Sequence, residues 1–329
     1  MDGSWRVKLC EDIIAGQPLR LEDARHIVEL EGPDLMELLA LANRVKWTNK
    51  GGNVFFCAII NARSGRCEQD CAFCAQSAHY DTGAPEYDFV EMERITDAAR
   101  RAKVEGAMRF SIVTSGLGLT NSEEIDTVAE GLRAICKEGV RACASVGILG
   151  PEALLELKNA GLTRYHHNLE TAPSYFKEIC TTHDYKDDIE TIKRAKSIGL
   201  ETCCGGIFGM GESWEQRIEL LCFLAELQPD AVPLNFLIPI PGTPLEGTSD
   251  LTPMDCLKII ALARLILPRA DIVLCGGREV NLREMQSLAL FAGASGLMIG
   301  DYLTTPGRRP ELDRKMIVEA GLKLEEIPC

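Results

Sequence analysis

Three consecutive segments decide the fold: RFSIVT at positions 109–114, SEEIDTVAEGLRAICK at 122–137 and RACASV at 141–146. The first and third segments are short runs rich in apolar residues, which are typical of strands. The middle segment repeats apolar residues close to the i, i+3, i+4, i+7 spacing of a helix that buries one face. The order strand, helix, strand indicates a parallel pair of strands with a crossover helix.

The same alternation continues through most of the chain. The expected strands are Val54–Ile60, Arg109–Thr114, Arg141–Val146, Thr163–Asn168, Glu201–Ile207, Ala231–Leu237, Asp271–Leu274 and Gly296–Ile299. The expected helices between them include Ser122–Lys137, Pro151–Ala160, Tyr185–Ile198, Trp214–Leu227 and Thr252–Leu267. Eight strands joined by helices predict an α/β fold of the (β/α)8 TIM-barrel type, and an open doubly wound sheet is the alternative.

Residues 1–45 are expected to form an N-terminal helical extension packed on the barrel. Within it, Arg25–Asn43 reads as a helix with a break at Gly32-Pro33. The barrel is expected over 46–300, and 301–329 is expected to form a C-terminal tail that packs on it. No low-complexity segment or long linker divides the chain further.

The composition argues against a nucleic-acid-binding or membrane-spanning protein. Hydrophobic residues make up 46% of the 329 residues, and no apolar run approaches the roughly 20 residues that span a bilayer. The formal net charge of −14 leaves no basic surplus for binding a nucleic-acid backbone. Because the chain begins without an apolar signal segment, a cytoplasmic location is expected, and the 14 cysteines are then expected to be reduced.

The segment CEQDCAFC at 67–74 places Cys67, Cys71 and Cys74 at spacings of four and three residues. A structural zinc site and an electron-transfer [4Fe–4S] cluster both take four protein ligands. Three thiolates instead suit a [4Fe–4S] cluster whose fourth iron binds a substrate or a cofactor. S-Adenosylmethionine can occupy that iron through its amino and carboxylate groups, and an electron from the cluster then releases a 5′-deoxyadenosyl radical.

Polar and thiol residues gather at the expected strands and their carboxyl ends, where (β/α)8 barrels place their chemistry. The segment GGIFGMGE at 205–212 reads as G-x-I-x-G-x-x-E, and its glycines are candidates for close backbone contact with an adenosine. The alternative interpretation is a flexible turn capped by Glu212. His166 and His167 are adjacent in a strand, so at most one of them faces the barrel interior.

Together these segments resemble the biotin synthase family, whose members are radical S-adenosylmethionine enzymes. The resemblance runs from about Asn53 to Pro306 and rests on CEQDCAFCAQS (67–77), YHHNLET (165–171), CCGGI (203–207), GGRE (276–279) and FAGA (291–294). It implies a (β/α)8 barrel and a sulfurtransferase reaction that inserts sulfur between two unactivated carbons of dethiobiotin to form biotin. It also implies an electron-donor protein of the flavodoxin or ferredoxin type, a homodimer, and no nucleic-acid or membrane partner.

The resemblance further implies roles for individual residues. Cys67, Cys71 and Cys74 would hold the radical-generating [4Fe–4S] cluster. Asn235 matches a position that binds the ureido ring of dethiobiotin, and Asn168 is expected beside the substrate as well. The residues implied to contact S-adenosylmethionine are Phe73 near the adenine, Thr114, Asn168, Glu170, Gly206 and Ile207.

A second, auxiliary cluster supplies the sulfur in this family, and here the chain departs from the better-known pattern. Family members with a [2Fe–2S] sulfur donor use three cysteines and an arginine. Cys143, Cys203 and Arg278 match these positions, but Ser111 stands where the remaining cysteine would be. A hydroxyl group is a poor ligand for iron in a sulfide cluster.

Two further thiols, Cys57 in the first expected strand and Cys275 at the end of the seventh, are expected at neighbouring heights in the barrel. Since alternate strands contribute side chains to one layer of a barrel, we hypothesise that they join Cys143 and Cys203 in a cysteine-richer auxiliary cluster, either [2Fe–2S] or a four-iron type. Cys204 is expected to point the other way. The cysteines expected to be packing or surface residues are Cys10, Cys136, Cys180, Cys222, Cys256 and Cys329.

Two rival functions are considered. Another radical enzyme on the same barrel, such as a hydrogenase-maturation or amino-acid-rearranging relative, would need no sacrificial sulfur source, and Arg278 beside Cys143 and Cys203 argues against it. A non-catalytic iron–sulfur protein would hold a cluster with four thiolate ligands. The open fourth ligand position of the Cys67–Cys74 segment argues against that function.

Overall fold

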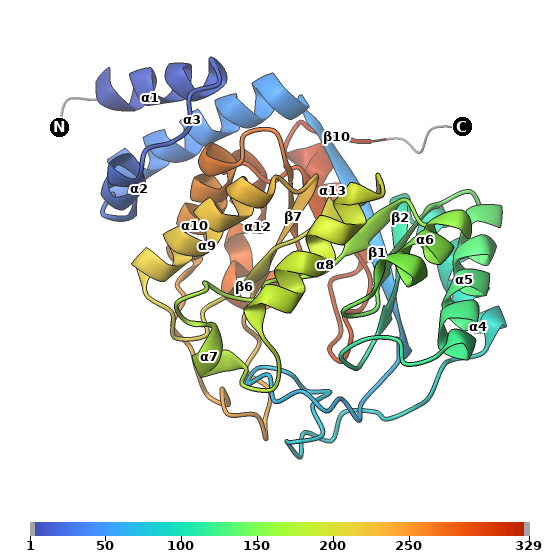
Figure 1. The fold of residues 1–329 in the computed structure, drawn as a ribbon. Coiled ribbons are helices and arrows are strands. Elements are labelled where there is room, and N and C mark those ends of the chain that lie inside the picture. The colour runs from blue at the N-terminus through green and yellow to red at the C-terminus, as the bar shows by residue number, and fades with distance from the viewer. Residues whose placement is uncertain (1–3, 326–329) are drawn as a thin grey trace.

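The computed structural model describes residues 4–325, and its strands form a closed parallel barrel surrounded by helices (Figure 1). The barrel strands are β1 (Asn53–Arg63), β2 (Ala107–Thr114), β3 (Arg141–Ser145), β4 (Arg164–His166), β5 (Glu201–Cys203), β6 (Gly206–Phe208), β7 (Ala231–Phe236), β8 (Asp271–Leu274) and β9 (Gly296–Met298). β1 pairs with both β2 and β9, which closes the sheet. β5 and β6 share one position, because both pair with β7. The expected (β/α)8 barrel is confirmed, and the open sheet is excluded.

The helices between the strands pack on the outside of the barrel. They are α4 (Met92–Val104), α5 (Ser122–Lys137), α6 (Pro151–Asn159), α7 (Phe176–Ile179), α8 (Tyr185–Ser197), α9 (Trp214–Leu227), α10 (Pro253–Ile266), α11 (Arg278–Asn281), η1 (Arg283–Met285) and α12 (Gln286–Phe291). α5 and α9 have the bounds that the sequence predicts. α9 begins with a capping box, in which Ser213 and Gln216 exchange hydrogen bonds with each other's backbone amides.

Three helices precede the barrel: α1 (Ser4–Ile14), α2 (Leu21–Val28) and α3 (Gly32–Lys50). The break lies at 29–31, so Pro33 stands in the first turn of α3, where its missing N–H breaks no helical hydrogen bond. α3 packs on α10 and α12, and the buried ammonium group of Lys46 donates to the carbonyl of Leu290 at 3.0 Å. Figure 1 shows these helices at the end of the barrel opposite the long loop that follows β1.

The strand expected at Glu201–Ile207 is divided in two around Cys204 and Gly205. A Cβ on Gly205 would stand only 2.0 Å from the carbonyl oxygen of Pro233 on β7. Glycine is therefore required for the close approach of the two backbones. β4 is also shorter than expected and ends at His166.

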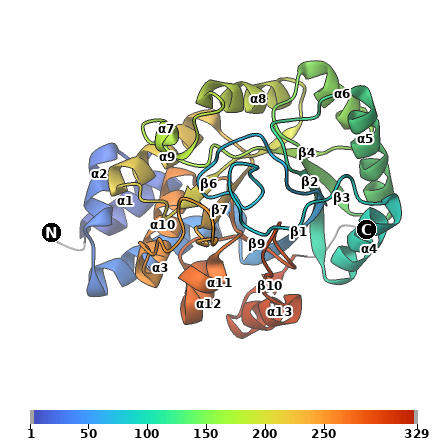
Figure 2. The same ribbon diagram turned by 90° about the horizontal axis from the view of Figure 1, so that it is seen from below.

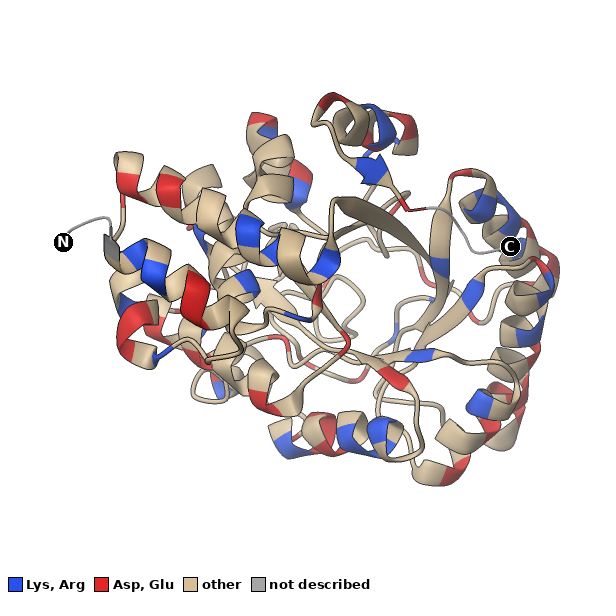
Figure 3. Cartoon of the chain, turned by 90° about the horizontal axis from the view of Figure 1, so that it is seen from above, with Lys and Arg blue, Asp and Glu red and all other residues tan. Residues whose placement is uncertain are grey.

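The C-terminal segment returns to the barrel through α13 (Pro310–Glu319) and β10 (Lys323–Leu324). β10 pairs in parallel with the first two residues of β1. Cys329 lies outside the described residues. Figure 3 shows acidic and basic residues interspersed along the outer helices. Within 4–325, no helix combines the length and the apolar character needed to cross a bilayer.

Candidate active site at the carboxyl ends of the strands

A cavity of about 340 Å³ opens at the carboxyl ends of the strands and extends into the barrel. Its volume is within the range of small-molecule sites in proteins. The long connection between β1 and α4 crosses the mouth of the barrel, and Figure 2 shows it in blue to cyan when the barrel is viewed from that end. The cavity is therefore lined both by side chains of this connection and by side chains of the strands.

Cys67, Cys71 and Cys74 lie on a compact loop within that connection. The amide of Cys67 donates to the carbonyl of Gln76 at 3.1 Å, and the amide of Cys74 donates to the carbonyl of Cys71 at 2.9 Å. Cys74 and its neighbour Phe73 line the cavity. Burial raises the pKa of the Cys74 thiol to about 11, and nearby Cys67 adds to the shift. This thiol is therefore neutral in the free chain, and metal binding would release its proton.

The arrangement of these cysteines fits a cluster better than a single metal ion. Within residues 4–325, no three His, Cys, Asp or Glu side chains converge as ligands of one ion. In a [4Fe–4S] cluster each thiolate binds a different iron atom, so the sulfur atoms need not meet at one point. Three thiols on one loop beside an open cavity leave the fourth iron accessible to a bound molecule.

Hydrogen bonds fix the cysteine loop to the segment that follows α7. The Asp70 carboxylate accepts from the amides of Thr181 at 2.9 Å and Thr182 at 3.3 Å and from both hydroxyl groups. The amide of Ala72 donates to the carbonyl of Ile179 at 2.9 Å. Partial burial acts to raise the pKa of Asp70, but these hydrogen bonds outweigh it and hold the pKa well below its usual range. Asp70 is therefore charged at neutral pH.

Cys180, expected to be a packing or surface residue, is buried directly behind Cys71. A hydrogen bond between the two thiols and burial raise the pKa of Cys71, whereas the same hydrogen bond lowers the pKa of Cys180 to about 6. Cys180 Sγ lies 3.2 Å from Nδ1 of His183, whose Nε2 lies 3.3 Å from the Asp188 carboxylate. Cys180 does not line the cavity, so it contacts Cys71 from behind. Nothing in the sequence indicated this contact.

Asn168 and Glu170 follow β4 and line the cavity together with Ile207. Asn168 Nδ2 donates to Glu170 Oε2 at 3.3 Å, and its Oδ1 accepts from the amide of Gly205 at 3.2 Å. Glu170 has a φ of 61°, which residues other than glycine rarely adopt. Burial raises the pKa of its carboxyl group to about 8. A buried carboxyl group on a strained backbone in a cavity marks a candidate binding residue.

Two residues expected to contact the cofactor do not line the cavity. A Cβ on Gly206 would stand 2.5 Å from the carbonyl oxygen of Glu170, so this glycine allows two backbones to pass closely. Thr114 is buried at the end of β2, and its hydroxyl group has no hydrogen-bond partner among the described residues. Glu212 accepts two amides of its own turn at 2.8 and 2.7 Å, as the alternative interpretation of this segment predicts.

Adjacent residues in the strands face opposite sides, as expected. His166 lines the cavity, and burial lowers its pKa to about 4. His167 faces outward, with Nε2 2.8 Å from the carboxylate of Asp188. Cys203 lines the cavity, whereas Cys204 is buried in the apolar core outside it. The two adjacent histidines therefore do not form a metal site.

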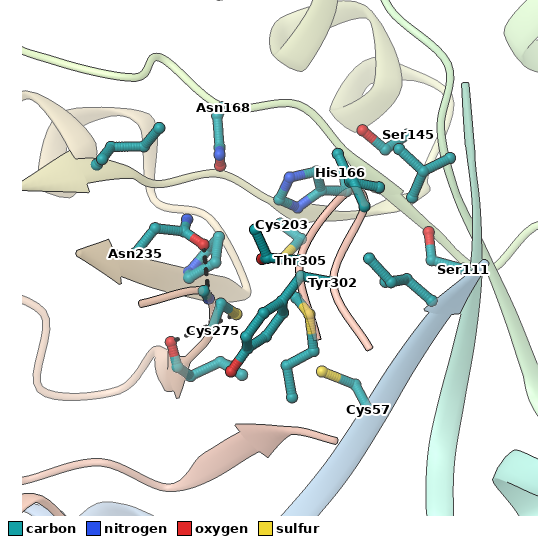
Figure 4. Close-up of a pocket in the computed structure, with 18 of the residues that line it drawn as sticks. Cys57, Ser111, Ser145, His166, Asn168, Cys203, Asn235, Cys275, Tyr302 and Thr305 are labelled. Carbon is teal, nitrogen blue, oxygen red and sulfur yellow. Dashed lines mark hydrogen bonds between the residues drawn. The ribbon is translucent and has the colours of Figure 1, made fainter. Parts of the chain in front are cut away.

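Asn235 on β7 lines the cavity, where Figure 4 shows its side chain, and it is held by hydrogen bonds at both ends. Its Nδ2 donates to the carbonyl of Gly206 at 3.2 Å, and its Oδ1 accepts from the amide of Gly276 at 3.0 Å. An asparagine amide has a second hydrogen atom and a second lone pair. Asn235 is therefore fixed in orientation and retains hydrogen-bonding capacity for a ligand.

The structure brings Cys57, Cys143, Cys203 and Cys275 to one cavity, and Figure 4 shows Cys57, Cys203 and Cys275 entering it from different strands. Burial raises the pKa values of Cys57 and Cys203 to about 12 each, and the pKa of Cys275 also rises. Neighbouring thiols add to all three shifts, which places them close to one another. Ser111 lines the same cavity, and its hydroxyl group has no hydrogen-bond partner among the described residues.

The expectation that Arg278 approaches this set of thiols stays a prediction: its charge acts to lower the pKa of the Cys275 thiol, but its side chain is engaged in an ion pair. Its guanidinium donates to the Asp313 carboxylate at 3.0 and 2.5 Å and to Gln286 Oε1 at 2.7 Å. Arg278 and Asp313 are both fully buried, and Arg278 does not line the cavity. Arg278 stands after Gly277, whose φ of 80° turns the chain out of the strand direction. Beyond this turn the alternation of side chains in β8 no longer determines which way Arg278 faces.

Two other arginines face the cavity: Arg109 on β2 and Arg164 on β4. Neither arginine was among the residues predicted from the sequence to belong to the site, although the spacing of residues in both strands indicates that they face inward. Each stands two residues before a side chain that lines the same cavity, Ser111 and His166 respectively. Because residues two apart in a strand face the same side, this spacing indicates that both arginines point inward.

Comparisons with known proteins agree with this fold. The model of the Radical SAM superfamily matches residues 62–224, and that of the Biotin and Thiamin Synthesis associated domain matches residues 233–323. Methylornithine synthase has the same fold, with a TM-score of 0.85 and 22% identity over 97% of this chain and 98% of its own. A maturase of the [FeFe]-hydrogenase also has this fold, with a TM-score of 0.80 and 16% identity over 98% of this chain and 75% of its own. A closed barrel with three cysteines at its mouth defines a radical S-adenosylmethionine enzyme.

Full-length relatives identify the family within that class. Biotin synthase from Geobacter sulfurreducens is 51% identical over 319 residues, which cover 97% of each chain. Biotin synthase from Desulfatibacillum aliphaticivorans is 48% identical over 322 residues, or 98% of each chain. The chain belongs to the biotin synthase family and is an enzyme of radical sulfur insertion. This family implies a [4Fe–4S] cluster and S-adenosylmethionine, and the rival radical functions are not favoured.

Proposed function

We propose that this chain converts dethiobiotin to biotin, with S-adenosylmethionine as the radical source and an auxiliary iron–sulfur cluster as the sulfur donor. The observation that supports the proposal is one cavity with two sets of thiols. The loop 67–74 stands at its mouth, and Cys57, Cys143, Cys203 and Cys275 line its interior. An enzyme that only generates a radical needs the first set alone, whereas sulfur insertion needs a second place for a sulfur source.

In this proposal Cys67, Cys71 and Cys74 hold the [4Fe–4S] cluster, which when bound supplies the electron that cleaves S-adenosylmethionine. The hydrogen bonds of Asp70 with Thr181 and Thr182 keep the cysteine loop at the mouth of the barrel. A small donor protein of the flavodoxin or ferredoxin type delivers the electron. The enzyme acts as a homodimer.

Glu170 binds the amino group of S-adenosylmethionine in this proposal. Its carboxyl group has a pKa of about 8 in the free chain because it is buried, and a nearby cation lowers that pKa and favours the carboxylate. Asn168 orients Glu170 through the hydrogen bond at 3.3 Å and offers its remaining capacity to a ribose hydroxyl group or to the substrate. Phe73 packs against the adenine, and Asn235 binds the ureido ring of dethiobiotin.

The four interior thiols hold the auxiliary cluster. They come from β1, β3, β5 and the residue after β8, and together they supply a full set of ligands without Arg278. Four thiolates suffice for either a [2Fe–2S] or a [4Fe–4S] cluster, so the iron count of the purified protein distinguishes the two types. Ser111, whose hydroxyl group has no protein partner, lines the same space and is left out of the ligand set.

The test of this function is product analysis. The chain is reconstituted anaerobically with iron and sulfide, reduced, and given S-adenosylmethionine and dethiobiotin. We expect biotin and 5′-deoxyadenosine, together with more iron than one [4Fe–4S] cluster contains. Formation of 5′-deoxyadenosine without biotin would support the radical reaction but contradict dethiobiotin as the substrate.

We expect Cys57→Ala and Cys275→Ala to remove iron from the auxiliary site and to abolish biotin formation. Loss of a residue that only supports a ligand costs about 10- to 100-fold in metal affinity, so we expect each cysteine ligand to cost at least about 100-fold. Iron and sulfide analysis, with 5′-deoxyadenosine release measured beside it, checks this result. Release of 5′-deoxyadenosine is expected to persist, because the cysteine loop is intact.

Cys204→Ala is the matched control for both variants, since Cys204 adjoins Cys203 but is buried outside the cavity. It is expected to keep its full iron content. If the Cys57 and Cys275 variants also kept full auxiliary iron, the four-thiol site would be wrong.

A further inference from the structure

The deep part of the cavity has a positively charged wall. The charged residues that line the cavity are Arg109, Arg164 and Glu170, and the first two are the basic ones. The side chains of Arg109 and Arg164 are only 8% and 7% exposed. Arg109 Nη1 lies 3.9 Å from Cys143 Sγ, so one guanidinium directly contacts an interior thiol.

One carboxylate holds both arginines in place. Glu201 Oε2 accepts from Arg109 Nη2 at 2.6 Å and from Arg164 Nε at 2.9 Å. Arg164 Nη2 lies a further 3.7 Å from Asp271, but Asp271 also pairs with Lys50 at 2.6 Å. Two buried guanidinium groups therefore share one fully committed carboxylate, and a positive charge remains unbalanced.

The position of the carboxylates determines where that charge acts. Glu201 begins β5 and Asp271 begins β8, so both lie at the amino end of the barrel, and their side chains are 41% and 22% exposed. Neither of them lines the cavity. The guanidinium groups therefore stand between solvent-exposed carboxylates on one side and the interior thiols on the other.

A buried positive charge without full compensation is costly unless a negative group completes its surroundings. Among the described residues, Glu201 and Asp271 are the only carboxylates paired with these two guanidinium groups, and neither lines the cavity. Cysteine thiolates and sulfide ions bound to iron are negatively charged, and a cluster held by the interior thiols would supply this charge on the side of Arg109 that contacts Cys143.

We infer that Arg164, together with Arg109, balances the negative charge of the auxiliary cluster and that Glu201 positions both guanidinium groups for this role. The inference rests on the proposed function, because it requires a cluster at the interior thiols. A positive charge nearby stabilises the more negative, reduced form of a cluster, so it raises the midpoint potential. Glu201 is the positioning residue in this account, and Arg164 acts through its charge without binding iron.

The experiment uses the full-length chain with Cys67, Cys71 and Cys74 replaced by alanine, so that only the auxiliary cluster contributes iron and spectroscopic signal. Arg164→Gln, Arg164→Lys and Glu201→Gln are compared in this background by anaerobic redox titration, with iron and sulfide counted beside it. Arg141→Gln is the matched control, since Arg141 is an exposed arginine on β3 that does not line the cavity.

We expect Arg164→Gln to lower the ratio of reduced to oxidised cluster at a fixed potential about tenfold, which equals about 60 mV for a one-electron couple. Glu201→Gln is expected to shift the ratio in the opposite direction, because it removes a negative charge and retains both arginines. Arg164→Lys is expected to stay close to the parent chain.

Two results would overturn the inference, and a third would refute the proposed auxiliary cluster on which it rests. A shift in Arg164→Gln no larger than in Arg141→Gln contradicts the charge effect. Shifts of the same sign in Arg164→Gln and Glu201→Gln indicate a merely structural role. If Arg164→Gln does not fold, Glu201→Gln alone tests the charge effect, and the absence of a rise in the ratio of reduced to oxidised cluster contradicts it. A parent chain without iron and sulfide would instead refute the auxiliary cluster itself.

Discussion

Cys71→Ala is expected to abolish the release of 5′-deoxyadenosine from S-adenosylmethionine. Cys71 belongs to the loop that carries three thiols, and a [4Fe–4S] cluster with only two thiolate ligands is not held against exchange of its iron. Because removing a residue that merely supports a ligand costs about 10- to 100-fold, we expect loss of the ligand itself to cost more than about 1000-fold. Chromatography of the nucleoside product from the reduced, reconstituted protein measures the effect.

The contact between Cys71 and Cys180 requires a second variant. Cys180 is buried behind Cys71, and its thiol is a conceivable substitute ligand when Cys71 is absent. The double variant Cys71→Ala/Cys180→Ala removes that possibility. Cys222→Ala, a half-buried thiol on α9, is the control and is expected to keep normal product release. Undiminished release from the double variant would contradict the assignment of the loop.

Asp313→Ala is expected to lower the free energy of unfolding by about 3–5 kcal/mol, because it leaves the buried Arg278 guanidinium without its carboxylate partner. Asp313 is fully buried and accepts two hydrogen bonds from Arg278, and Arg308 Nη1 lies 3.1 Å from the same carboxylate. A loss of this size is a large part of the stability of a typical domain, which is about 5–15 kcal/mol. Urea titration of the iron-free chain measures it.

Glu311→Ala is the matched control on the same helix. Glu311 lies in the first turn of α13, its side chain is 69% exposed and it pairs with Arg309 at 3.7 Å. An exposed pair of this kind contributes at most about 1 kcal/mol. In folded Asp313→Ala protein we expect the iron content of the auxiliary site to be unchanged. Selective loss of that iron without a loss of stability would indicate that Arg278 belongs to the auxiliary cluster site.

Strand parity explains how much of the site could be predicted. Side chains alternate from one face of a strand to the other wherever backbone pairing continues, so the inward facing of Cys203 and His166 and the outward facing of Cys204 and His167 follow from local sequence. The same rule, applied to β2 and β4, predicts that Arg109 and Arg164 face inward. It does not reach Arg278, which follows the end of β8 and the turn at Gly277.

The sequence by itself determined the alternation of strands and helices and the three-cysteine loop, whereas the pairing of β1 with β9 in the tertiary structure decided that the sheet is closed. The alternation and the loop depend on periodicity and spacing within short segments, which local backbone geometry imposes. Only the tertiary structure decided the partners: Cys180 behind Cys71, Asp313 with Arg278, and Glu201 between two arginines. These pairs join residues far apart in the chain. Their contacts arise only when the barrel closes and its helices pack, because burial and charge compensation depend on every neighbour that then surrounds them.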